Sequence, residues 1–133
     1  MPEDEYQKYE QACKRIKKDN TKLLEQFAQW LSGKGLAEKT VRRHVENADF
    51  YINTFLLYED AIPATEGASH ISMFLGYWFI RKAMWASPSA IRENAGSLKK
   101  FYTFMREQGK VSAGTLDDLK ATVKEEMPKW VGT

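Results

Sequence analysis

Residues 41–55 read VRRHVENADFYINTF and residues 91–105 read IRENAGSLKKFYTFM, and the two stretches share one apolar pattern. In each stretch five apolar side chains are spaced by four, three, four and three residues; they are Val41, Val45, Ala48, Ile52 and Phe55, and Ile91, Ala95, Leu98, Tyr102 and Met105. Successive residues of an α-helix are rotated by about 100°, so this spacing places all five on one side of a helix. The sequence therefore predicts two amphipathic helices built on one pattern.

An arginine directly follows the first apolar residue of each pattern: Arg42 in one and Arg92 in the other. On a helix this position is rotated away from the apolar side, so the arginine can face water. Two amphipathic helices of one pattern, each with a basic first turn, indicate two equivalent surfaces that contact one long partner. Nucleic acid is the obvious candidate for such a partner, because its phosphates attract exposed cations.

The remaining long segments also have helical periodicity, and none alternates with the period of two that strands show. The expected helices cover residues 4–19, 21–31, 38–58, 68–83, 88–109 and 115–128. Cap-forming residues at 19–21 separate the first two, and the pattern leaves open whether these form one bent helix. The segment 68–83 is apolar almost all round, which is typical of a helix in the middle of a core.

Two of the expected helices begin at recognisable caps. Ser87 precedes Pro88, which suits an N-cap followed by the first helical position. Thr115 with Asp118 resembles a capping box at the start of the last helix. Pro128 is expected to end that helix, because proline lacks the backbone N–H that a helix interior requires.

Length and composition fit one all-helical domain. The chain has 133 residues, of which 43% are apolar and 29% charged, so it is long enough for one buried core. We therefore expect an all-α fold: a single domain over residues 1–133, forming a compact bundle of five to six helices. Residues 113–133 have two open alternatives, because their apolar side can cover the core or dock on a neighbouring protein.

The expected location is the cytoplasm. The one cysteine, Cys13, allows no internal disulfide and fits a reducing compartment. Met1 is followed by acidic residues rather than by the basic and apolar leader of a signal peptide. The longest apolar run, residues 71–80, is far shorter than the ~20 residues of a membrane span. We therefore expect a soluble protein with no membrane partner.

Charge is sorted along the chain, although the net charge is only +2. Residues 14–22 hold five basic residues and one acid, residues 34–43 hold four and one, and residues 92–110 hold five and two. Residues 46–66 hold five acids and no base. Both repeated helices thus begin or continue in basic segments, which favours a polyanionic partner if these segments meet in space.

The residue types that carry metal, cofactor or covalent chemistry are not arranged for it. His44 and His70 stand on different expected helices, and neither has a further ligand at metal-site spacing. His44 adjoins two arginines, so it is either a phosphate contact or an ordinary surface histidine. The eight glycines are scattered, which does not match a phosphate-binding loop. We therefore expect no metal, no cofactor and no catalytic residue.

Two turns of the chain resemble one known family. Residues 35–44 read GLAEKTVRRH and follow a helix with Phe27, Trp30 and Leu31; residues 87–92 read SPSAIR and lead into LKKFYTF at 98–104. In this order and spacing they resemble the N-terminal core-binding domain of tyrosine recombinases (phage integrases). The resemblance covers residues 23–111, which makes residues 4–19 and 115–128 helical extensions.

The resemblance implies a SAM-like helical fold that forms half of a clamp around double-stranded DNA. The positions that match the contacting turns are Lys39, Thr40, Arg42 and Arg43 on one helix, and Ser89, Arg92 and Asn94 on the other. It also implies a link to DNA integration or recombination, with a full-length recombinase or a second copy of the chain as a further partner. The catalytic half, with its His-x-x-Arg motif and nucleophilic tyrosine, has no counterpart here, so we expect no enzyme activity.

The same scaffold allows a second function, a helical protein–protein interaction module that has lost DNA binding. The near-neutral total charge favours it, and so do Ala37 and Ala90, which replace hydroxyl residues of the family's turns. The interface of such a module would use apolar residues outside the two patterns: Phe50, Leu57, Met84, Trp85 and Trp130. An enzyme of unrecognised type is the third alternative.

Overall fold

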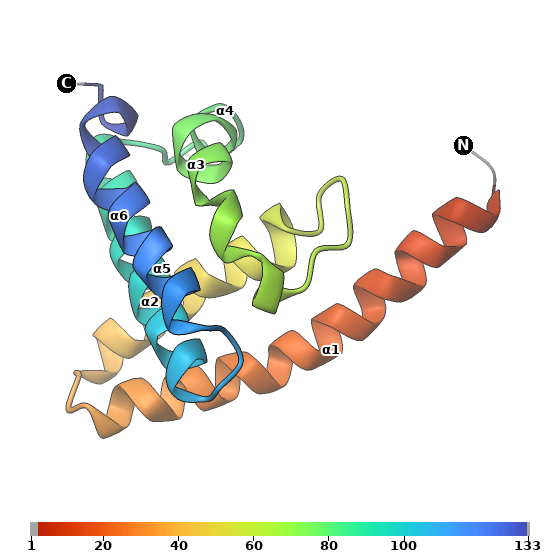
Figure 1. Ribbon diagram of the computed structural model, residues 1–133, viewed down its shortest axis with the longest axis horizontal. Helices are drawn as coiled ribbons and strands as arrows, with labels where there is room; N and C mark the ends of the chain where they lie inside the picture. The colour runs from red at the N-terminus through yellow and green to blue at the C-terminus, as the bar shows by residue number, and fades with distance from the viewer. Residues whose placement is uncertain (1–2, 133) are drawn as a thin grey trace. The chain divides into compact units, whose positions relative to one another are not determined.

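The computed structural model describes residues 3–132 (Figure 1). Over these residues every regular element is a helix and no strand occurs, which confirms the expected all-α fold class. The chain divides into two compact units, residues 1–67 and 68–133, and each is described by itself below. The single domain over residues 1–133 and the SAM-like type stay predictions.

The first unit begins with one long helix, α1 (Glu3–Gly33), so the two expected N-terminal helices are continuous (Figure 1). The cap-forming residues at 19–21 do not end it, and the side chains of Asn20 and Thr21 have other partners. Asn20 is buried, and its Nδ2 donates to the backbone oxygen of Ile52 at 3.2 Å and to Oδ1 of Asn53 at 2.8 Å. The hydroxyl of Thr21 donates to the backbone oxygen of Lys17, one turn earlier in the same helix.

A short turn leads from α1 into α2 (Glu38–Asp49), which packs against α1. Gly35 has φ +86° in this turn, a conformation that glycine adopts without strain. The helix then passes into the π-helical turn η1 (Phe50–Phe55), and the 3₁₀ turn η2 (Ala64–Glu66) follows after a loop. The helix expected to reach residue 58 therefore ends at Phe55.

The first apolar pattern faces the core of this unit. Val41, Ala48 and Ile52 are buried, while Val45 and Phe55 are half-buried. The phenol of Tyr51 is buried and donates to the backbone oxygen of Gly67 at 2.7 Å. The remaining buried apolar side chains of the unit are Phe27, Leu31, Leu56, Leu57 and Ala64.

The second unit starts with a run of short helical segments over the expected helix 68–83. They are the 3₁₀ turn η3 (Ala68–His70), α3 (Ile71–Met73), the π-helical turn η4 (Phe74–Trp78) and α4 (Phe79–Lys82). The expectation that this helix is buried on all sides is wrong. Phe74, Leu75 and Phe79 are buried, but Met73, Tyr77 and Ile80, spaced by four and three residues, are about half exposed on another side.

Helix α5 (Pro88–Glu107) carries the second apolar pattern, and all five of its residues are buried. The predicted cap is confirmed, since the backbone N–H of Ala90 donates to Oγ of Ser87 at 3.0 Å. Burial also raises the pKa of the Tyr102 phenol far above its usual value. The helix closes in a turn where Gly109 has φ +73°.

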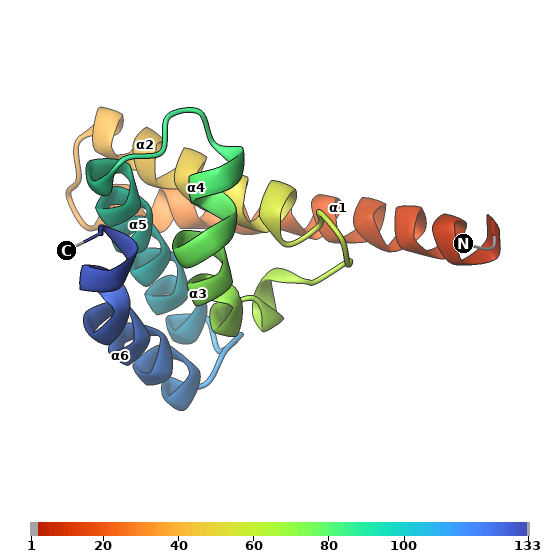
Figure 2. The same cartoon turned by 90° about the horizontal axis from the view of Figure 1, so that it is seen from above.

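Helix α6 (Ala113–Trp130) packs along α5, and Figures 1 and 2 show the two helices side by side. Its N-cap is Ser112, whose Oγ accepts from the backbone N–H of Thr115 at 3.1 Å, so the expected cap at Thr115 is wrong. It also continues through Pro128 to Trp130. Its apolar side covers the core of its own unit, with Leu116, Leu119, Val123 and Trp130 buried.

The end of α6 closes over the π-helical turn η4. A Cβ atom at Gly76 would lie 3.0 Å from Nε1 of Trp130, so the indole occupies the space that a side chain at residue 76 would need. One turn away, the hydroxyl of Ser72 donates to Oε2 of Glu126 at 3.1 Å. These contacts fix the side of α6 that faces the core, and therefore the side that stays outside.

Candidate nucleic-acid interface

The first predicted contact region is the first turn and a half of α2. Val41 and His44 are buried on its inner side, so the residues between them point outward. Lys39, Arg42 and Arg43 are exposed, and Thr40 is half-buried. Arg42 lies 3.6 Å from Oε1 of Glu38, one turn earlier. Both groups are well exposed, so this pair is weak and leaves the guanidinium accessible.

His44 and Ala37, at the two ends of this turn, also bear on the predicted contact. His44 is only 8% exposed, so neither expected role, phosphate contact or surface histidine, fits. Ala37 holds the N-cap position of α2 with an extended backbone and no side-chain cap. The first N–H groups of α2 therefore have no capping hydroxyl, as the replacement of a hydroxyl residue at this position suggested.

The second predicted contact region is the start of α5, where Ser89 and Arg92 are exposed. Asn94 does not join them, because it is only 4% exposed and its Nδ2 donates to the backbone oxygen of Ala90 at 2.9 Å. It lies three residues after Ile91 and four before Leu98, on the inner side of the helix. The predicted DNA contact by Asn94 is therefore inconsistent with its burial.

The structure thus groups the predicted residues by helix. Lys39, Arg42 and Arg43 lie together on α2 in the first unit, and Ser89 and Arg92 lie together on α5 in the second. That both groups contact one DNA duplex stays a prediction.

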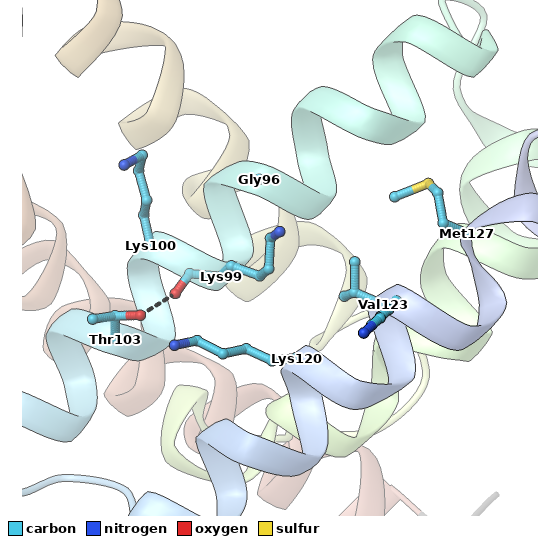
Figure 3. A pocket seen from close by; sticks show the side chains of 8 residues that line it. Gly96, Lys99, Lys100, Thr103, Lys120, Val123 and Met127 are labelled. Carbon is cyan, nitrogen blue, oxygen red and sulfur yellow. Dashed lines mark hydrogen bonds between the residues drawn. The ribbon is translucent and has the colours of Figure 1, made fainter.

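A groove between α5 and α6 adds basic residues that the sequence analysis did not select (Figure 3). It has a volume of about 720 Å³, and the described residues that line it are Gly96, Lys99, Lys100, Thr103, Lys120, Val123, Lys124 and Met127. Half of these residues are lysines. We call it the lysine groove. Figure 3 shows the side chain of Lys120 extending from α6 towards α5.

The electrostatics of the lysine groove are one-sided. No acidic residue is among the described residues that line it. Within residues 3–132 none of its four lysines forms an ion pair. Four lysines along one groove with no acidic residue in its lining produce a positive potential that attracts an anionic ligand.

The basic side of α5 extends past the groove in both directions. Arg92, Lys99 and Arg106 are spaced by seven residues, which is close to two helical turns, so they share one side of the helix. Arg92 and Arg106 are exposed and Lys99 is half-buried. The basic character of residues 92–110 was visible in the sequence. The contribution of Lys120 and Lys124 was not, because it depends on how α6 pairs with α5.

Other kinds of site find less support in the described residues. Residues 3–132 contain no group of three or more His, Cys, Asp or Glu side chains placed to hold a metal ion. None of the helices described combines the length and apolar character that crossing a bilayer requires. Comparison of the chain with models of protein families, with curated proteins and with solved structures finds no match.

Proposed function

We propose that this chain is a non-catalytic module that binds double-stranded DNA. The observation that carries the proposal is the exposed basic side of α5, which begins at Arg92 and continues into the four unpaired lysines of the groove. The α2 turn with Arg42 and Arg43 adds a second basic surface of the same kind. The resemblance to the core-binding domain of tyrosine recombinases links this binding to DNA integration or recombination.

The chemistry of these residues suits a duplex. Arginine and lysine neutralise phosphates, and hydroxyls such as that of Ser89 add hydrogen bonds to the backbone. An arginine that enters the major groove can donate two hydrogen bonds to the edge of a guanine. Exposed arginines on two helices can therefore supply both affinity and some sequence preference. As a further partner we propose a full-length recombinase or a second copy of the chain.

Removing the two arginines of α2 tests this proposal. Arg42→Ala with Arg43→Ala is expected to lower the slope of log affinity against log salt concentration by about 1.8, since each lost phosphate contact removes about 0.9. At about 0.1 M salt this corresponds to ~60-fold weaker binding. Fluorescence anisotropy of a labelled random duplex, measured at several salt concentrations, gives both quantities.

The matched control removes the same charge elsewhere in the first unit. Lys18→Ala with Lys22→Ala changes two exposed residues of α1 and is expected to leave the salt slope nearly unchanged. If the arginine variant and this control bind alike, Arg42 and Arg43 do not belong to the DNA site.

A second candidate function, a protein–protein interaction module, is favoured by one surface. Met73, Tyr77 and Ile80 are about half exposed on one side of the run 71–82, and the guanidinium of Arg81 lies 4.6 Å from the centre of the Tyr77 ring. In the following loop Met84 is 99% exposed and Trp85 is exposed as well. Of the interface residues expected from the sequence only these two are exposed; Leu57 and Trp130 are buried and Phe50 is half-buried.

The two functions predict different behaviour in solution. Under the second, sedimentation velocity would show a concentration-dependent dimer, Tyr77→Ser with Met84→Ser would abolish it, and no duplex would be retarded in low salt. Under the first, the monomer would bind duplex and these two substitutions would not change its salt slope.

A further inference from the structure

The lysine groove combines two kinds of surface along the α5–α6 pair. Lysines from both helices stand along it, with Lys99 and Lys100 on α5 and Lys120 and Lys124 on α6. Between the helices the lining is apolar or small: Val123 is buried, Met127 is half-buried, and Gly96 has no side chain. A ligand that matches this arrangement carries several negative charges and has carbon surface between them.

The length of the basic surface separates a polymer from a small anion. Ser89 and Thr103 are fourteen residues apart on α5, which at 1.5 Å per residue is about 21 Å. One strand of B-DNA carries a phosphate about every 3.4 Å along the helix axis, and its backbone path is longer because it winds around that axis, so this distance spans several phosphates of one strand. A single phosphate group would meet only a fraction of these cations.

We propose that the lysine groove binds the phosphodiester backbone of one DNA strand, with Lys120 and Lys124 of α6 as contact residues. The inference rests on the proposed function and deepens it, because it adds a second helix to the site in this unit. The phosphates lie against the ammonium groups, and the sugars lie over Val123 and Met127. Gly96 allows the strand to approach the α5 backbone closely.

Two exposed acids lie close to the groove near the turn that connects α5 to α6. Glu107 on α5 and Asp117 on α6 are exposed and lie at the end of the pair where the connecting turn is. Asp117 is three residues before Lys120, which places it within about 60° of that lysine around the helix. At this end of the pair the basic surface of the groove therefore adjoins an acid on each helix, and on α5 that acid directly follows the exposed Arg106.

Neutralising the two α6 lysines tests the groove directly. Lys120→Gln with Lys124→Gln is expected to weaken binding of a labelled duplex ~60-fold at about 0.1 M salt and to lower the salt slope by about 1.8. Both residues are exposed, so the fold is expected to persist, and circular dichroism melting checks this. Lys120→Arg with Lys124→Arg keeps both charges and is expected to keep the affinity and the slope.

The control lies in the same unit. Lys110→Gln with Lys129→Gln removes the same charge from exposed positions that do not line the groove, and Lys129 is about 180° around α6 from Lys120. If the wild-type chain binds duplex and the groove variant binds it as tightly as this control does, the groove inference alone is overturned. A wild-type chain that binds no duplex would overturn the proposed function as well.

A short ligand separates the polymer from a small phosphate compound. A dinucleotide carries the same chemistry but spans only a small part of the groove, so it is expected to displace the labelled duplex only at far higher concentration. Equal competition, mole for mole, would show that the groove holds a small phosphate ligand and would overturn the backbone assignment.

Discussion

Reversing the charge of three arginines, with Arg42→Glu, Arg43→Glu and Arg92→Glu in one chain, is expected to abolish duplex binding at physiological salt. Three lost phosphate contacts lower the salt slope by about 2.7, which corresponds to ~500-fold in affinity at about 0.1 M salt. The new carboxylates repel the phosphates in addition, so the measured loss is expected to be larger still. Anisotropy titration of a labelled duplex gives the affinity, and a thermal melt confirms that the exposed substitutions leave the fold intact.

The separate variants decide whether both helices contact one duplex. If they do, the α2 double variant and the α5 single variant each lose part of the binding free energy, and neither accounts for the whole loss in the triple variant. If only one helix binds, one of the partial variants accounts for the whole effect. Lys18→Glu, Lys22→Glu and Lys129→Glu together change the net charge equally, at exposed positions outside both predicted turns and outside the groove. If that control loses as much affinity as the triple variant, the loss is due to net charge and not to contacts made by the three arginines.

Leu98→Ala is expected to cost about 2–5 kcal/mol of unfolding free energy, because it removes a fully buried side chain from the centre of the second apolar pattern. Domains are typically stable by only about 5–15 kcal/mol, so this cost is a large part of the total stability. Urea denaturation followed by circular dichroism measures the loss. As urea unfolds the variant, DNA binding is expected to be lost together with the helical signal, since Leu98 holds the helix that presents Arg92 and Lys99.

The control substitution for this variant is two residues further along the same helix. Lys100→Ala changes an exposed position and is expected to alter stability by about 0.5 kcal/mol or less. A cost below about 1 kcal/mol for Leu98→Ala would contradict the assignment of the second pattern to the core.

Periodicity and local capping account for most of what the sequence predicted correctly. The second apolar pattern is wholly buried and the first is buried at three of its five positions. Ser87 caps α5 as expected, because a serine before a proline offers both the acceptor and the preset backbone angle. Arg42 and Arg92 are exposed because burial of the neighbouring Val41 and Ile91 turns them outward.

The errors arose where tertiary contacts override local signals. Asn20 resembles a cap former, yet it finds its partners on another element and the helix continues through it. Asn94 resembles an exposed polar contact, but its position on the inner side of α5 buries it. For α6, both Ser112 and Thr115 are plausible caps, and only the backbone shows that Ser112 holds the position.

The candidate site was only partly predictable for a related reason. Each basic turn follows from a few consecutive residues, so Arg42, Arg43 and Arg92 could be selected from the sequence. The groove needs two helices in one particular pairing, with Thr103 of α5 and Lys120 of α6 on its walls. No local pattern encodes that pairing. In the sequence alone, Lys120 and Lys124 look like ordinary lysines on the solvent-exposed side of a helix.

The amide of Asn20 has a consequence for how the first unit is aligned. Asn53 donates to Oδ1 of Asp49 at 2.6 Å, which leaves its own oxygen to accept from Asn20. Sliding α1 by one turn would separate these groups and leave a polar amide enclosed with nothing to bind, at about 1–3 kcal/mol. A leucine at position 20 would pack equally well in several registers of α1. In coiled coils, likewise, a single buried asparagine selects one register that apolar residues alone would not specify. One side chain in a 31-residue helix thus specifies its placement, and the outward positions around it can vary without shifting it.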